Sequence, residues 1–401
     1  MIQQNSLIFQ PAEILLPAGN LRKWSVIACD QFTSDEEYWA EADRFVGDAP
    51  SALRLMLPEY YLGRSDEAER MAQIQKTMLQ YLESGVFRSY PDSMVYLERK
   101  LSGGNVRRGL VGVIDLEAFD YSDHTNAPIR ASEHTVEDRL PPRIKVRREA
   151  AIEMPHIMLF FDDPEDFLME QAAAFSEDLL YDFDLMGGGG HVRGLRIHGK
   201  AAWQMAEAVS GREGFRFAVG DGNHSLAAAR NCWLERKREL SEAEQIKHPS
   251  RYALVELVNI HDPGVSFEPI HRVLFQTDTA HWFSAAREKL YDPKGRAITF
   301  LCGPSCCTIP VRGTAIGESI EQIEQFCKWY CKQFGGRIDY IHGDDETRHL
   351  SEADGCCGAL LPQMKKSELF RSVSEIGPFP KKSFSIGLGT DKRYYLECRR
   401  I

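Results

Sequence analysis

Residues 215–230, FRFAVGDGNHSLAAAR, constrain the fold more than any other stretch of the chain. FRFAV places apolar residues at alternate positions, which is typical of a strand, and GDGN has the composition of a tight turn. SLAAAR follows with residues that favour a helix, and Ser225 stands near the expected helix start. The stretch therefore predicts a strand, a turn and a helix in immediate succession.

Such a turn is suited to binding an anion. Amide groups in the first turn of a helix have no partner within the helix, and the helix dipole adds positive potential at the same place. Asp221 is the candidate ligand of Mg²⁺ or acceptor of a hydroxyl proton, and His224 is the candidate for a phosphate contact or a proton transfer. The predicted phosphate-binding residues of the turn are Gly220, Gly222, Asn223 and Ser225.

A purely structural role is the alternative for this turn. Asp221 and Ser225 are equally suited to capping the helix, and His224 to a buried hydrogen bond. Strand-to-helix turns that contain glycine are common, and an element of the fold does not by itself establish a site. The stretch alone leaves both interpretations open.

The rest of the chain alternates helix-like and strand-like stretches. Residues 34–46 and 65–84 carry apolar residues at helical spacing, with Ser34 as the expected N-cap of the first helix. The runs SMVYLERKL and RRGLVGVIDLEAF, separated by SGGN, predict a hairpin. Because these elements interleave without a regular repeat, we expect a mixed α/β or α+β fold.

The length of the chain predicts more than one domain. With 401 residues, 43% of them hydrophobic, it can bury a large core and is too long for one compact unit. We place the boundary near residue 272. An N-terminal and central part, 1–272, then holds the glycine-containing turn, and a C-terminal α+β lobe, 273–401, packs on it.

Charge limits the partners that we expect. The chain has 48 Lys and Arg residues against 59 Asp and Glu residues, and the net charge of −11 argues against nucleic acid and anionic membranes. No basic segment followed by an apolar one opens the chain, and no stretch of about eighteen residues is uninterruptedly apolar. We therefore expect a cytoplasmic protein whose partners are small molecules, and no oligomeric state follows from the sequence.

Cysteine spacing and missing motifs argue against several cofactors. The ten cysteines stand in adjacent pairs or at spacings that lack the matching second pair of a zinc site, so buried thiols are expected instead. The patterns GxxxxGK[ST], HExxH and GxSxG are absent, as is a strand-linked GxGxxG. We predict no zinc, no flavin and no NAD.

A basic segment between residues 130 and 148 is a second candidate for ligand binding. Guanidinium groups bind phosphate in two-pronged fashion, so the segment predicts a polyphosphate pocket; a solvated charged helix is the alternative, although Pro141 and Pro142 argue against one continuous helix. Glu133 is the candidate general base for a substrate hydroxyl. The cations are Arg130, Arg139, Arg143, Lys145, Arg147 and Arg148, of which Arg139 and Arg147 are the predicted phosphate ligands.

Two later segments add candidates. In HDPGVSFEPIHR, His271 and Arg272 are suited to binding a ligand at a strand edge, or to satisfied structural hydrogen bonds. In GPFPKKSFSIGLG, Lys382 stands on a loop that either closes over a phosphate or is a simple soluble turn.

The motifs together resemble a known family. GDGNHSLAAA is similar to the DGHHR…A signature of the family called domain of unknown function 1015, which is itself similar to the ParB and sulfiredoxin-like fold. Supporting segments, which with the signature cover about residues 28–389, are ACDQFTSDEEYW, RASEHTVEDRL, NIHDPGVSFEPIHRVL, YIHGD and GPFPKKSFSIG. The resemblance implies a ParB/sulfiredoxin-like core with additional N- and C-terminal lobes. It also implies a signature turn that binds nucleotide phosphate, as in relatives that include ATP- or ADP-dependent kinases of free serine.

One departure from that signature bears on chemistry. Asp221, Gly222 and His224 match it, but Asn223 and Ser225 stand where the commoner signature has His and Arg. An arginine clamp on the turn is therefore missing. Either another arginine replaces it, or the ligand carries less negative charge.

We therefore expect a small-molecule kinase that uses Mg²⁺ with ATP or ADP. The 220–225 turn would hold nucleotide phosphates, with Asp221 on Mg²⁺, while Glu133 activates a hydroxyl such as that of free serine. One alternative is a non-catalytic protein that binds a nucleotide or metabolite for regulation, which Asn223 and Ser225 favour because weaker charge stabilisation suits binding better than transfer. A phosphatase of a small phosphorylated metabolite is the other alternative.

Overall fold

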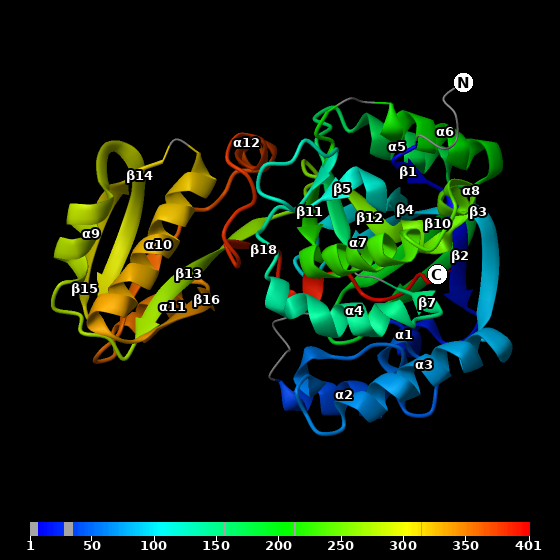
Figure 1. Cartoon of the computed structure of the whole chain (residues 1–401), viewed down its shortest axis with the longest axis horizontal. Helices are drawn as coiled ribbons and strands as arrows, with labels where there is room; N and C mark the ends of the chain where they lie inside the picture. Colours follow the sequence, from blue (N-terminus) through cyan, green and yellow to red (C-terminus); the bar gives the residue numbers. More distant parts are fainter. Residues whose placement is uncertain (1–6, 28–34, 155–156, 212–213, 314) are drawn as a thin grey trace.

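Two β-sheets organise the structure, a computed structural model that describes residues 7–27, 35–154, 157–211, 214–313 and 315–401. The larger sheet has 11 strands and the smaller has six. Figure 1 shows the smaller sheet and its helices set apart from the larger body, with strand β13 leading from one to the other. The mixed α+β fold predicted from the sequence is confirmed.

The larger sheet combines antiparallel and parallel neighbours. Nine strands follow the order β5-β6-β11-β8-β12-β4-β3-β10-β9, while β1 pairs with β4 and β2 with β3. The predicted hairpin is formed by β3 and β4, whose register places Val95 opposite Val111. The bounds are β1 Phe9–Gln10, β2 Ala12–Pro17, β3 Phe87–Lys100, β4 Val106–Asp115, β5 Phe119–Asp120, β6 Ile129–Arg130, β8 Met158–Phe161, β9 Asp178–Asp184, β10 His191–His198, β11 Phe217–Asp221 and β12 Tyr252–Asn259.

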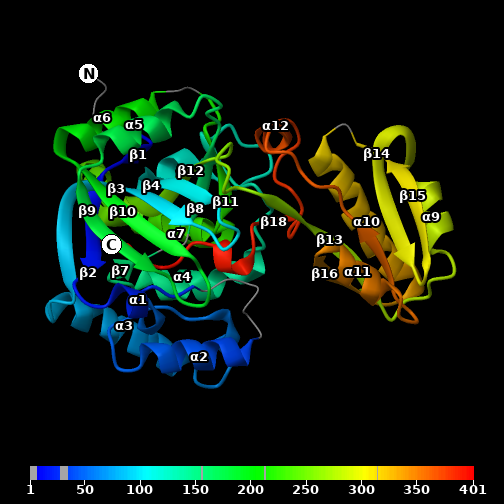
Figure 2. The ribbon, with the colours of Figure 1, turned by 180° about the vertical axis from the view of Figure 1, so that it is seen from behind.

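Helices cover the larger sheet on both faces. Along β4, Leu110 and Ile114 join one hydrophobic cluster while Val111 and Val113 join another, as expected for side chains that alternate across a strand. The first cluster takes in residues of α5, α6 and α7, and the second takes in residues of α2 and α3. Figures 1 and 2 show α5 and α6 on one side of the larger body and α2 and α3 on the other. The bounds are α1 Leu21–Trp24, α2 Glu36–Val46, α3 Glu67–Glu83, α5 Phe167–Phe175, α6 Gly199–Ser210, α7 Asn223–Lys237 and α8 Glu242–Lys247.

The helix starts follow from local sequence. Helix α2 has Asp35 as its N-cap, whose carboxylate accepts a hydrogen bond from the amide of Tyr38 at 2.9 Å, whereas the predicted cap Ser34 lies outside the described residues. Helix α4 (Leu140–Arg148) begins with two prolines in its first turn, where proline is tolerated because the amide there has no helical partner. The prolines thus start a new helix after the short turn Glu137–Arg139.

The smaller sheet packs in a third hydrophobic cluster, which also takes in Met158 and Phe160 of β8 in the larger sheet. Its order is β15-β14-β17-β13-β16, with β18 added on β13. Trp282 of α9 packs edge-on against Tyr330 of α10 with ring centroids 4.9 Å apart, and against Phe326 at 5.1 Å. The bounds are β13 Phe267–Phe275, α9 Trp282–Leu290, β14 Tyr291–Cys302, β15 Ser305–Val311, α10 Ile316–Phe334, β16 Arg337–His342, α11 Asp344–Ser351, β17 Cys357–Leu360, α12 Glu368–Glu375 and β18 Phe384–Ile386.

The last part of the chain returns to the larger body. Strand β19 (Arg399–Arg400) pairs with β7 (Ile152–Glu153), and Tyr394 and Leu396 join the cluster that holds α2 and α3. The division of the chain at residue 272 stays a prediction; strand β13 runs through that position. Among the described residues, no helix combines the length and the apolar character needed to cross a membrane.

Candidate functional site

A cavity of about 450 Å³ gathers most of the residues singled out in the sequence. Its wall combines the β11–α7 turn and α4 of the larger body with β16 and β18 of the smaller sheet. The segments 55–58 and 392–395 complete it. The predicted site residues on the wall are Glu133, Arg139, Arg147, Gly220, Asp221, Gly222, Asn223, His224, Ser225 and Lys382.

The β11–α7 turn has the predicted strand–turn–helix form. Strand β11 ends at Asp221, and Gly222 follows as the N-cap of α7 with φ of 86°, a conformation that strongly favours glycine. The Asp221 carboxylate accepts a hydrogen bond from the Gly222 amide at 2.9 Å, one residue ahead of the helix. Because the N-cap itself has no side chain, the cap position of α7 presents only backbone to the cavity.

The first two residues of α7 fasten the segment that carries Glu133. The Asn223 side chain accepts a hydrogen bond from the amide of Ser132 at 3.2 Å, and His224 Nε2 accepts one from the amide of Val136 at 3.1 Å. An imidazole that accepts at Nε2 carries its proton on Nδ1 when neutral. His224 therefore makes the structural hydrogen bond considered for it, in addition to lining the cavity.

Glu133 lies between this helix start and the loop that precedes β18. Its carboxylate accepts hydrogen bonds from the amides of Ser383 at 3.1 Å and Lys382 at 3.4 Å. Burial raises the pKa of Glu133 to about 7, while those two amides and the charge of Lys392 act in the opposite direction. A carboxyl group with a pKa near neutrality can both accept and release a proton at physiological pH.

Asp221 is paired with a cation that the sequence did not single out. Its Oδ2 atom lies 3.1 Å from Nζ of Lys392, which also lines the cavity. Within the described ranges, no group of three or more His, Cys, Asp or Glu side chains is arranged to hold a metal ion. Asp221 thus offers one carboxylate, and a bound Mg²⁺ would need its other ligands from phosphate and water, as is common for this ion.

The basic segment divides between the cavity and other partners. Arg147 lines the cavity and forms an ion pair of 2.6 Å with Glu153, while Arg139 and Arg143 line it from the start of α4. The described lining does not include Arg130, whose guanidinium stacks over Phe215 at 4.5 Å. It does not include Lys145 or Arg148 either.

His271 and Arg272 are placed differently from the other candidates. Both are buried in β13, and neither belongs to the described lining of the cavity. His271 bonds to Asp344 at 2.9 Å, and Arg272 to Glu324 at 2.8 Å, so both make hydrogen bonds of the structural kind, and their part in ligand binding stays a prediction. Arg272 acts on the site indirectly, because its guanidinium also donates to the carbonyl oxygen of Lys382 at 3.0 Å.

Several lining residues carried no local signal in the sequence. Lys392 stands in an ordinary charged stretch, and Tyr340 and His342 occur in a segment that was noticed only for its resemblance. An apolar part of the wall comes from the N-terminal region through Trp39, Leu55, Met56 and Met78.

Comparisons with solved structures gave chains of low identity. SbnI with a C-terminal truncation from Staphylococcus aureus is 11% identical, with a TM-score of 0.38 over 69% of this chain and 82% of that chain. A conserved hypothetical protein from Pyrococcus furiosus is 12% identical, with a TM-score of 0.36 over 69% of this chain and 90% of that one. A free serine kinase in complex with AMP is 11% identical, with a TM-score of 0.38 over 70% and 93%.

Curated proteins gave no significant match. The model of one family matches residues 10–399, which is nearly the whole chain. The resemblance noticed in the sequence is thereby confirmed. The chain belongs to the family described as Protein of unknown function (DUF1015).

Proposed function

We propose that the cavity binds a nucleotide and that the protein transfers a phosphoryl group to the hydroxyl of a small metabolite such as free serine. One observation carries the proposal. The start of α7, several cationic side chains and a carboxyl group with a pKa near 7 all converge on one cavity of about 450 Å³.

The two halves of the wall suit the two halves of a nucleotide. Amides at the start of a helix favour phosphate, and the side chains of Arg139, Lys381 and Lys382 add positive charge to the same cavity. Trp39 and Met56 offer apolar surface for a base. A volume of this size lies within the range of pockets that enclose small ligands.

Glu133 is the residue to which we assign proton transfer. In the transfer step the acceptor O–H bond breaks and its proton passes to the Glu133 carboxylate. The acceptor oxygen forms a bond to phosphorus, and the bond from phosphorus to the leaving nucleotide oxygen breaks. Such a reaction needs mainly alignment and neutralised charge. Asp221 would hold Mg²⁺, which when bound neutralises phosphate charge.

The first test is binding followed by transfer. ATP or ADP with Mg²⁺ at millimolar concentration is expected to raise the melting temperature, since a ligand that binds only the folded state stabilises it. With labelled nucleotide and a panel of hydroxylated amino acids, E133Q should reduce transfer by about 100-fold or more while binding persists. The matched control is E137Q, on the exposed turn just beyond.

The outcomes separate the alternatives. The proposal fails if neither nucleotide shifts the melting temperature. A shift without transfer to any acceptor would favour the regulatory protein, which the substitution of Asn223 and Ser225 for the signature's His and Arg also favours. Release of inorganic phosphate from phosphorylated metabolites, without transfer, would favour the phosphatase.

A further inference from the structure

Lys392 enters the cavity from the last part of the chain, and the transfer step above does not use it. Its Nζ atom lies 3.1 Å from the Asp221 carboxylate, at the end of β11. The side chain is 12% exposed, so its ammonium group is held at the wall of the cavity.

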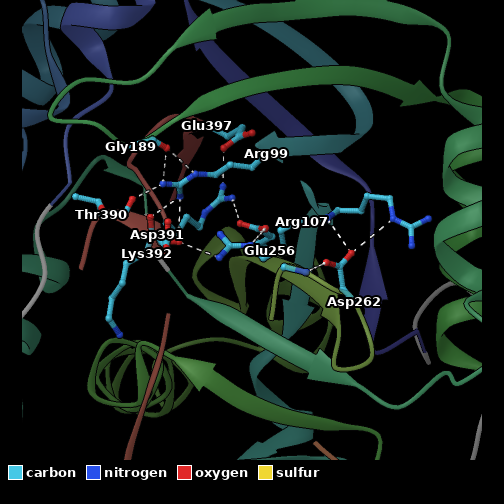
Figure 3. Close-up of polar contacts among 12 residues, drawn as sticks. Arg99, Arg107, Gly189, Glu256, Asp262, Thr390, Asp391, Lys392 and Glu397 are labelled. Carbon is cyan, nitrogen blue, oxygen red and sulfur yellow. Dashed lines mark hydrogen bonds and ion pairs between the residues drawn. The ribbon is translucent and has the colours of Figure 1, made fainter. Parts of the chain in front are cut away.

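Two arginines of the larger sheet donate hydrogen bonds to the backbone carbonyl groups around Lys392. Figure 3 shows Arg99 and Arg107 converging on this segment, while the Lys392 side chain extends away from them. Arg99, from β3, donates hydrogen bonds to the carbonyl oxygens of Thr390 and Lys392, both at 2.5 Å. Arg107, from β4, donates to the carbonyl oxygen of Asp391 at 2.9 Å.

The residues on either side of Lys392 are fixed as well. The Asp391 carboxylate accepts a hydrogen bond from the Ser102 hydroxyl at 3.1 Å. On the other side, Arg393 donates to Glu256 and to Glu397, each at 2.5 Å. The carbonyl groups of residues 390–392 and the side chains of Asp391 and Arg393 are therefore held by hydrogen bonds, most of them charge-assisted, which are the strong ones.

Burying the charged groups of Arg99 and Arg107 costs desolvation free energy, so stability alone does not explain their position. Arg99 is 3% exposed and Arg107 is 1% exposed, and burying a guanidinium is favourable only when its hydrogen bonds are well made. Among the residues that the structure describes, the hydrogen-bond acceptors of Arg99 are backbone carbonyl groups. These buried guanidinium groups fix the position of residues 390–393, and from that segment the Lys392 side chain reaches the cavity.

We propose that Lys392 binds a phosphate group of the ligand, and that Arg99 and Arg107 are positioning residues that hold it in place. Without ligand, Lys392 neutralises Asp221; the incoming phosphate takes the place of Asp221 as the partner of Nζ. Lysine is a common point-charge ligand of phosphate, and Lys381 and Lys382 line the same cavity. The inference rests on the proposed function, to which it adds a phosphate ligand.

Calorimetric titration with inorganic tripolyphosphate tests the role of Lys392. K392M should weaken binding about tenfold, the effect of losing one charged hydrogen bond. K294M, which removes an exposed lysine of β14, should leave the affinity unchanged. In buffer without Mg²⁺, D221N should strengthen binding in the wild-type background, because it removes the carboxylate that competes for Lys392.

The positioning role needs its own readout. R99K keeps the charge but cannot span the same carbonyl groups, so it should weaken tripolyphosphate binding about threefold. In the double variant R99K/K392M, the affinity for tripolyphosphate should be no lower than in K392M alone. A general structural effect of R99K would instead add to the effect of K392M. If R99K does not fold, R107K replaces it in the same double-mutant comparison with K392M.

Each outcome decides the matter. Equal affinity of the wild type and K392M, or no binding of tripolyphosphate, overturns the inference about Lys392, and additive losses overturn the positioning role. If tripolyphosphate binds through Lys392 while ATP and ADP do not bind, the nucleotide of the proposed function fails and Lys392 keeps its role as a phosphate ligand.

Discussion

Glu133 and Glu153 line the same cavity in opposite surroundings. Glu133 accepts hydrogen bonds from backbone amides, and burial raises its pKa to about 7. Glu153 lies between Arg147 at 2.6 Å and Arg399 at 2.8 Å. Burial alone would raise the pKa of Glu153, but these two guanidinium groups outweigh it and lower the pKa.

The difference shows that surroundings, and not residue type, assign roles at this site. A carboxylate between two guanidinium groups stays ionised and joins α4 to the last strand of the larger body. A carboxyl group held by backbone amides, with its pKa raised to about 7, can change its protonation state near neutral pH. Glu153 is thus suited to structure, and Glu133 to chemistry.

Loss of the Glu153 charge should have the largest effect on stability. E153Q leaves two arginine groups of the buried network without their anion, so we expect the free energy of unfolding to fall by about 3–5 kcal/mol. E133Q removes no ion pair and, at about pH 5, where Glu133 is protonated in the folded protein, should change it by about 1 kcal/mol or less. Urea denaturation of both variants measures the contrast, and equal losses would contradict it.

The second-largest expected effect is on the pH dependence of the free energy of unfolding, to which Glu133 and Glu153 should contribute with opposite sign. The pKa of Glu133 is raised in the folded protein from 4.5 to about 7, so its stabilising contribution is complete below pH 4.5 and is lost as the pH rises through 7. The effect should be on the order of 2 kcal/mol. Glu153, with a lowered pKa, contributes above its ordinary pKa and loses that contribution in acid.

Urea denaturation of wild type and E133Q between about pH 5 and pH 8 checks this prediction. The wild type should lose stability relative to E133Q as the pH rises. A constant difference between the two proteins would show that Glu133 titrates with an ordinary pKa.

The smallest expected effect concerns the loop that donates to Glu133. Lys382 has φ of 55°, a left-handed conformation that costs a residue with a side chain about 1 kcal/mol. K382G should therefore raise the free energy of unfolding by about that amount. The neighbouring K381G, at a position without this conformation, should lower it by about 0.5–1 kcal/mol. A loss in both variants would mean that the loop stores no strain.

Local chemistry explains which parts were predictable from sequence. Strand β11, the turn and α7 were predicted because sixteen consecutive residues carry alternation, glycine and helix formers. Lys392 was missed because its partner Asp221 lies 171 residues away along the chain. His271 and Arg272 were named as ligand-binding candidates, but their partners, 73 and 52 residues distant, were invisible in the sequence.

The C-terminal residues pack on the larger body. Folding of that body therefore depends on residues that are synthesised last. Residues 390–393 supply acceptors for Arg99 and Arg107 and one guanidinium beside Glu256, and Arg399 supplies a partner of Glu153. A fragment ending before β14 would lack these partners, and Glu153 would keep only Arg147 of its two guanidinium groups. We therefore expect the two sheets to unfold together in one cooperative transition. The larger body produced without the C-terminal residues is not expected to fold by itself.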